Sequence, residues 1–86
     1  VACPVDLRAA VVARVAAAYE AAGRRLVTID GVKAFSDDGW VLLRPSGTEP
    51  LLRLFAESKD PATARRLADE GRASVDAAVR TLTASA

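Results

Sequence analysis

Residues 40–56 read Trp40-Val41-Leu42-Leu43-Arg44-Pro45-Ser46-Gly47-Thr48-Glu49-Pro50-Leu51-Leu52-Arg53-Leu54-Phe55-Ala56. Two apolar runs, residues 40–43 and 51–56, flank a polar loop, Arg44–Pro50. Both runs have the length and composition of buried strands. A loop that joins two buried strands must emerge at the rim of the sheet, because buried backbone donors and acceptors would be left without partners. We therefore expect this loop to be exposed to solvent.

The chemistry of the loop suits an anion. Arg44 and Arg53 supply planar guanidinium groups, and Ser46 and Thr48 supply hydroxyl donors. Gly47 lets the backbone direct its N–H groups toward a common point without a Cβ in the way. Most Ser-Gly-Thr loops are only turns, so a plain turn stays open as the alternative. A P-loop is excluded, since no Gly-x-x-x-x-Gly-Lys pattern occurs in the chain.

The segments on either side of this stretch predict two helices. Asp6 is a candidate N-cap for a first helix, whose apolar residues recur every three or four positions and which ends at Gly23. Asp60 followed by Pro61 predicts the start of a second helix. The predicted buried faces are residues 7, 11, 15, 18 and 22 of the first helix and residues 64, 67, 68, 71, 75, 78, 79 and 82 of the second. Gly71 lowers helix propensity, and we favour a role in permitting close approach to the sheet over the alternative that it is only a poor local choice. We expect Ser85 and Ala86 to fray.

Four strands are predicted between the helices, at residues 26–29, 32–35, 40–43 and 51–57. Asp30-Gly31 is a strong hairpin signal, and residues 36–39 form a second turn. Alternation in the last strand places Leu52, Leu54 and Ala56 toward the core. The pattern predicts one α+β domain over residues 1–86, with a four-stranded, mainly antiparallel sheet and two helices on one face.

Composition excludes several classes of function. The formal net charge of the 86-residue chain is +1, and basic residues in the last helix are matched by acidic ones at helical spacing, so we expect no nucleic-acid partner. No stretch is apolar enough to cross a membrane. The single cysteine, Cys3, fits the reducing cytoplasm, and the absence of methionine suggests a fragment of a longer protein.

The run Gly39–Arg53, preceded by Asp30-Gly31-Val32-Lys33, resembles the C-terminal (fourth) domain of the α-D-phosphohexomutases. This family includes phosphoglucomutase, phosphomannomutase and phosphoglucosamine mutase. The Arg-x-Ser-Gly-Thr-Glu-Pro core is the most specific part of the resemblance. It implies the fold of the family's fourth domain, which is similar to one half of the TATA-box-binding protein.

The resemblance also implies a function. Phosphohexomutases interconvert hexose 1-phosphates and 6-phosphates through a phosphoserine and a bisphosphate intermediate. The phosphoserine, the Mg²⁺ ligands and the sugar-contacting loop belong to the preceding domains of such an enzyme. The fragment alone is therefore expected to be inactive, with no catalytic residue, metal ligand or cofactor of its own. Its expected partners are a hexose phosphate or bisphosphate and the preceding domains of the same chain.

Matched to the family motif, the substrate phosphate-binding residues are Arg44, Ser46, Gly47, Thr48 and Arg53. The role of Glu49 is open between orienting an arginine and capping the loop, and we favour the structural role. The alternative function is a stand-alone anion- or protein-binding module without catalysis, in which the sheet face would dock a partner. A serine loop and an acidic metal loop upstream in the parent reading frame would favour the mutase.

Overall fold

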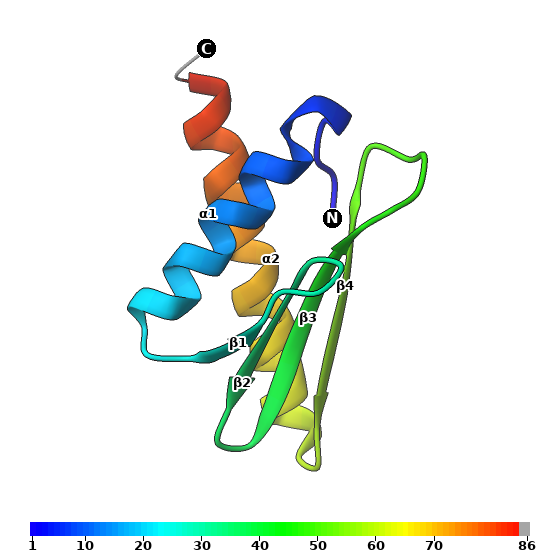
Figure 1. Cartoon of the computed structure of the whole chain (residues 1–86). Helices are drawn as coiled ribbons and strands as arrows, with labels where there is room; N and C mark the ends of the chain where they lie inside the picture. The colour runs from blue at the N-terminus through cyan, green and yellow to red at the C-terminus, as the bar shows by residue number, and fades with distance from the viewer. Residues whose placement is uncertain (85–86) are drawn as a thin grey trace.

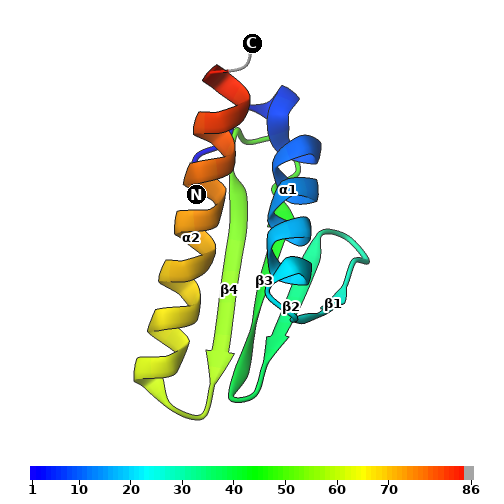
Figure 2. The same cartoon turned by 90° about the vertical axis from the view of Figure 1, so that its left-hand side faces the viewer.

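The computed structural model describes residues 1–84, and the expected fraying of Ser85 and Ala86 lies outside this range. In chain order, the elements are the 3₁₀ turn η1 (Val5–Leu7), α1 (Arg8–Ala21), β1 (Arg25–Val27), β2 (Val32–Ser36), β3 (Gly39–Pro45), β4 (Leu52–Ser58) and α2 (Pro61–Ala84). The strands form one antiparallel sheet in the order β1-β2-β3-β4. Both helices cover the same face of it, as Figure 1 and Figure 2 show from two sides. The predicted α+β class is confirmed.

The core lies between this face and the helices. Helix α1 packs mainly over β1 and β2, and α2 over β3 and β4. Alternate strand residues point into the core, and the predicted set Leu52, Leu54 and Ala56 is on the helix side of β4, with Leu52 fully buried. The core therefore follows from strand alternation, because successive side chains of a strand point to opposite faces.

Helix α1 differs from its prediction in its N-cap and in which residues near its C-terminal end are buried. Asp6 lies in η1 and is not the N-cap of α1. The N-cap is Leu7, the helix begins at Arg8, and no side chain caps it with a hydrogen bond. The inward-facing residues are Val11, Val15 and Tyr19, whereas Ala18 is exposed. A large aromatic ring buries more apolar area than an alanine methyl, so the helix is rotated to bring Tyr19 inward. Ala22, at the C-cap, is exposed as well.

The end of α1 matches its prediction. Gly23 has φ +81°, a conformation that glycine adopts without strain. The N–H of Gly23 donates to the carbonyl of Glu20 at 2.9 Å, and the N–H of Arg24 to that of Tyr19 at 3.0 Å. These bonds satisfy carbonyls that the helix end would otherwise leave free.

Strand β1 is shorter than the predicted run of residues 26–29. It pairs with β2 only as far as Val27 opposite Lys33, so Thr28 and Ile29 have no strand partner, and Ile29 is 78% exposed. The turn requires φ 56° at Asp30 and φ 122° at Gly31. This backbone cannot continue a strand, which is why the hairpin signal is right and the strand boundary is wrong.

Strand β3 extends two residues further toward the polar loop than predicted, whereas β4 begins at Leu52, one residue later than predicted. Arg44 pairs with Arg53, and Pro45 with Leu52, so the connecting loop is residues 46–51. The N-terminal segment lies beside its second half. The N–H of Leu52 donates to the carbonyl of Val1 at 2.8 Å, and the N–H of Cys3 to that of Pro50 at 3.0 Å. This short bridge covers the start of β4, which would otherwise be an open sheet edge.

The outer face of the sheet has no helix over it. Its aromatic rings are partly covered by cations, with the Arg25 guanidinium 4.0 Å from the centre of Phe35 and the Lys33 ammonium 4.3 Å from the centre of Trp40. Such stacking lets an aromatic side chain remain at a solvated surface.

Candidate functional site

The loop after β3 borders a hollow of about 390 Å³ at one end of the sheet. Three residues predicted for the anion site line it: Arg44, Ser46 and Gly47. The other walls are Arg8 from α1, Pro45, and the Asp30-Gly31 turn. The hollow thus gathers two guanidinium groups and one carboxylate around the glycine of the loop.

A larger hollow, of about 560 Å³, lies at the opposite end of the sheet. Arg24, Arg25 and Arg66 line it. Arg24 and Arg66 both interact with Glu70, at 2.8 and 4.0 Å, and the Arg25 guanidinium lies over the ring of Phe35. Asp37 and Asp38 face it as well. Its charges are balanced internally, so it is a poorer anion site than the smaller hollow, where Arg8 and Arg44 face a single acid, Asp30.

Ser46 is more enclosed than an exposed loop predicts, at 3% exposure. Its N–H donates to the carbonyl of Leu51 at 3.3 Å, and its carbonyl accepts a bond from the Arg8 guanidinium. Beyond Ser46, the residues from Gly47 to Pro50 are exposed. The loop is therefore exposed as predicted except at its first residue, Ser46, which is buried because both its N–H and its carbonyl are hydrogen-bonded within the fold.

The loop keeps backbone donors available. Among the described residues, the N–H groups of Gly47, Thr48 and Glu49 donate to no other backbone group. Consecutive unpaired N–H groups on an exposed bend form a concavity that favours negative charge. These three N–H groups are therefore available to an anion or to water.

Two glycines near the hollow, Gly31 and Gly47, have different surroundings. At Gly31, an added Cβ would lie 2.2 Å from the carbonyl oxygen of Leu43 and 3.0 Å from the Cα of Arg44, so the turn is pressed against β3. At Gly47, an added Cβ would meet nothing within 4 Å. Nothing inside the domain therefore requires a glycine at position 47, and the open space in front of its backbone is available to a ligand.

Arg53 and Thr48 do not line the hollow. Arg53 is the strand partner of Arg44, and its guanidinium lies 3.9 Å from the carboxylate of Glu49. The side chains of Arg53 and Glu49 are 55% and 59% exposed, so this ion pair contributes little to stability and is easily exchanged. The role of Glu49 therefore stays a prediction.

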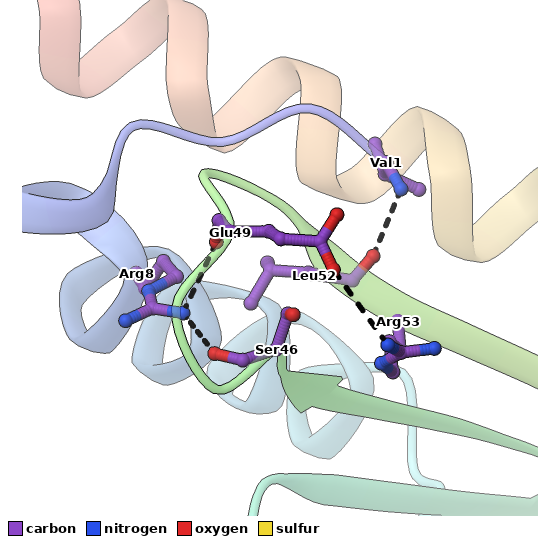
Figure 3. Close-up of polar contacts among 6 residues, drawn as sticks. All are labelled: Val1, Arg8, Ser46, Glu49, Leu52 and Arg53. Carbon is purple, nitrogen blue, oxygen red and sulfur yellow. Dashed lines mark hydrogen bonds and ion pairs between the residues drawn. The ribbon is translucent and has the colours of Figure 1, made fainter.

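Arg8 is a site residue that the sequence did not reveal. Its Nη1 donates to the carbonyl of Ser46 and, at 3.4 Å, to the carbonyl of Glu49. Figure 3 shows Arg8 on one side of the loop and the Arg53–Glu49 pair on the other. The contact joins residues 38 and 41 positions apart, and no local pattern in the sequence signals it.

Other chemistry is not supported within the described range. Residues 1–84 contain no group of three or more acidic, cysteine or histidine side chains that could hold a metal ion. Cys3 is 1% exposed, and burial raises the pKa of its thiol, against a smaller opposing effect of Arg8. A buried thiol with a raised pKa is a poor nucleophile. Neither α1 nor α2 is long and apolar enough to cross a membrane.

Comparison with known proteins gives a consistent result. Residues 1–74 match the family model described as phosphoglucomutase/phosphomannomutase, C-terminal domain. A phosphoglucomutase/phosphomannomutase of Thermococcus kodakarensis is 48% identical over 64 residues, which are 74% of this chain and 14% of the relative. A probable phosphoglucosamine mutase of Methanopyrus kandleri is 46% identical over 68 residues, 79% of this chain and 15% of the relative. The chain is also 36% identical over 80 residues to a probable phosphoglucosamine mutase of Pyrococcus abyssi, 91% of this chain and 18% of the relative.

Proposed function

Because the chain belongs to the phosphoglucomutase/phosphomannomutase family, as its C-terminal domain, we propose that the loop after β3 binds the phosphate group of a hexose phosphate. The chain spans 14% of the length of the T. kodakarensis relative. The wider proposal is that it works within a cytoplasmic enzyme interconverting hexose 1-phosphate and 6-phosphate through a phosphoserine and a bisphosphate intermediate. Alone, it would bind and not catalyse.

One observation carries this proposal: the loop offers cations and unpaired N–H groups around an open space. Arg44 and Ser46 line the hollow beside Gly47, and the N–H groups of Gly47 and Thr48 have no backbone acceptor among the described residues. Charge-assisted hydrogen bonds to phosphate are the strongest that such groups make. Without a ligand, these N–H groups would form hydrogen bonds with water.

Each side chain would have its own role. Arg44 would neutralise phosphate charge, Ser46 and Thr48 would donate hydroxyl hydrogen bonds, and the backbone at Gly47 would donate N–H bonds. Arg53 would serve as a second cation by exchanging its weak contact with Glu49 for the ligand. That exchange costs little, since both partners are largely solvated.

Phosphate recognition of this kind suits a substrate that must bind in two opposite orientations. A site that contacts the phosphate and leaves the sugar ring alone can hold either end of a bisphosphate. The group being transferred, the phosphoserine and the Mg²⁺ site would then belong to the preceding domains. This domain would hold the phosphate that stays in place, and would contribute affinity more than choice of sugar.

A phosphate titration tests the site directly. Inorganic phosphate is added to the ¹⁵N-labelled chain at constant ionic strength, with chloride as the matched anion. We expect the amide resonances of Gly47 and Thr48 to move, with a Kd of about 1 mM or weaker, since few charge-assisted bonds remain after association costs. Arg44→Ala should abolish the movement, and Arg65→Ala, at an exposed position of α2, should not. Movement confined to helix residues would refute the site.

A further inference from the structure

Arg8 occupies a position that is locally unfavourable. It is the first residue of α1, whose first turn contains no acidic residue. A cation there is repelled by the positive end of the helix dipole. Residues that break a local rule are often held by contacts elsewhere in the fold, and frequently belong to functional sites. Arg8 has such contacts, because its guanidinium reaches two carbonyl groups of the loop (Figure 3).

The two carbonyls lie near opposite ends of the loop. One belongs to Ser46, immediately before Gly47, and the other to Glu49, immediately before Pro50. A single Nη1 that bonds to both draws the ends of the bend together and fixes its curvature. The Glu49 carbonyl also accepts the N–H of Leu51 at 2.8 Å, so Arg8 adds a side-chain bond to a bend that the backbone already closes on that side.

The contact with Ser46 also sets the direction of a proposed phosphate donor. The carbonyl of Ser46 and the N–H of Gly47 belong to one planar, trans peptide unit, in which they point in opposite directions. With the carbonyl directed at Arg8, the N–H of Gly47 is directed away from it. The guanidinium also neutralises the negative ends of two peptide dipoles, so the loop presents its positive ends to an incoming anion.

We propose that Arg8 is a positioning residue, which holds the peptide planes of loop 46–51 so that the N–H of Gly47 and the side chain of Arg44 meet the substrate phosphate. This inference rests on the proposed phosphate site. It links helix α1 to the loop and gives the first turn of α1 a part in binding. Arg8 acts through the loop, and the guanidinium that contacts the ligand is that of Arg44.

The test compares Arg8→Ala and Arg8→Lys with Arg14→Ala in the ¹⁵N-labelled chain. Arg14 is an exposed arginine of the same helix, so its loss controls for charge and helix content. Two readouts are taken: the heteronuclear NOE of Gly47 and Thr48 without ligand, and the Kd for inorganic phosphate. Thermal unfolding is followed in parallel, because loss of stability alone would leave both loop readouts unchanged.

We expect Arg8→Ala to lower the NOE at Gly47 and Thr48 and to weaken phosphate binding roughly three- to tenfold, as for the loss of one or two hydrogen bonds that preorganise a loop. Arg8→Lys should give intermediate values, since an ammonium can reach a carbonyl but lacks the planar fork of arginine. Arg14→Ala should match the unmodified chain. Should Arg8→Ala fail to fold, Arg8→Lys decides by the same readouts.

The possible failures are distinguishable. An unchanged NOE and an unchanged Kd in the Arg8 variants would overturn the positioning role. If the unmodified chain shows no phosphate binding, the proposed function is overturned, and the NOE of the phosphate-free Arg8→Ala variant alone decides whether Arg8 holds the loop.

Discussion

At the scale of single residues, the ring of Tyr19 stabilises the core, whereas its buried hydroxyl reduces stability. Its side chain is 5% exposed, and its hydroxyl is buried without a hydrogen-bond partner in the described structure. Burial raises the pKa of the Tyr19 phenol, Glu70 raises it further, and Arg24 lowers it. A buried polar group without a partner reduces stability, while the ring around it contributes to the core.

Tyr19→Phe should therefore be neutral or stabilising, with a gain of up to about 2 kcal/mol in the free energy of unfolding, because the ring stays and the unsatisfied hydroxyl is removed. The phenol has a higher pKa in the folded chain than in the unfolded one. The folded chain therefore keeps its full stability while the phenol is protonated, below the unfolded pKa. It loses stability as the pH rises through the folded pKa. Above about pH 10, the original chain should lose stability that Tyr19→Phe retains.

Denaturation at neutral and alkaline pH, followed by the fluorescence of the single tryptophan, Trp40, measures both effects. Since Tyr19 is the only tyrosine, the absorbance of its phenolate titrates this residue alone. Marked destabilisation of Tyr19→Phe at neutral pH would mean that the hydroxyl has a stabilising partner.

The site residues were predictable to the extent that they are contiguous in sequence. Arg44, Ser46 and Gly47 follow one another along the chain, and the structure brings them to one hollow. Arg8 was not predictable, because it reaches the loop only after α1 has packed on the sheet. The burial of Ser46 was missed for the same reason, since it depends on bonds to Arg8 and to Leu51 across the loop.

At the scale of elements, α2 shows a start signal that is visible in sequence. Asp60 accepts bonds from the N–H of Ala62 at 3.3 Å and from the hydroxyl of Thr63 at 2.8 Å. The Thr63 hydroxyl first, and the backbone of Ala62 next, lower the pKa of the Asp60 carboxyl. The cap was predictable because all its partners lie within three residues. The end of β1 was not predictable, because it depends on where the pairing between β1 and β2 stops.

Asp60→Ala should lower the melting temperature at neutral pH, and Asp60→Asn should preserve most of it, since asparagine also caps helices well. The carboxyl has a lower pKa in the folded chain than in the unfolded one, so its contribution is present above the unfolded pKa and is lost as the pH falls through the folded pKa. Below about pH 4, the melting temperatures of the original chain and of Asp60→Ala should therefore converge. Thermal unfolding by circular dichroism across this range checks it, and a constant difference at all pH values would contradict it.

Gly71 lies where α2 packs closely on the sheet. An added Cβ would lie 2.7 Å from Cδ1 of Leu54 and 3.2 Å from Cγ2 of Val41. For Gly71→Ala, the helix-propensity gain of about 1 kcal/mol is offset by this contact, which the mobile end of Leu54 can partly relieve. We expect a change within about 1 kcal/mol for Gly71→Ala, but a loss of about 3 kcal/mol for Gly71→Leu, which cannot fit without moving α2. Denaturant unfolding measures both, and equal stabilities of the two variants would show that α2 is not closely packed there.

At the scale of the whole molecule, three segments that are distant in sequence meet at one end of the fold and form the candidate site there. The turn before β2, the loop between β3 and β4, and the first turn of α1 meet around one hollow, although they come from distant parts of the chain. The fold class followed from sequence because it depends on the periodicity of each element. The meeting of these three segments depends on helix packing, which periodicity does not specify.

If the domain recognises only phosphate, then its effect on an intact enzyme should not depend on the sugar. Arg44→Ala in such an enzyme should lower kcat/KM for glucose, mannose and glucosamine phosphates by a similar factor, whatever the starting preference. Loss of one charge-assisted interaction of about 1.5–3 kcal/mol corresponds to roughly a ten- to hundredfold decrease. Arg65→Ala, at an exposed position of α2, is the matched control and should leave all three values unchanged.

Initial-rate kinetics with the three substrates separate the possible outcomes. A uniform decrease agrees with a site that holds either end of the bisphosphate, because both phosphates then pass through the same contacts during one turnover. A decrease limited to one sugar would place ring recognition in this domain, with Asp30, the acidic residue that lines the hollow together with Arg44, as the candidate contact. Unchanged kinetics for all three would remove phosphate binding from the loop, and with it the reason for an open space in front of Gly47.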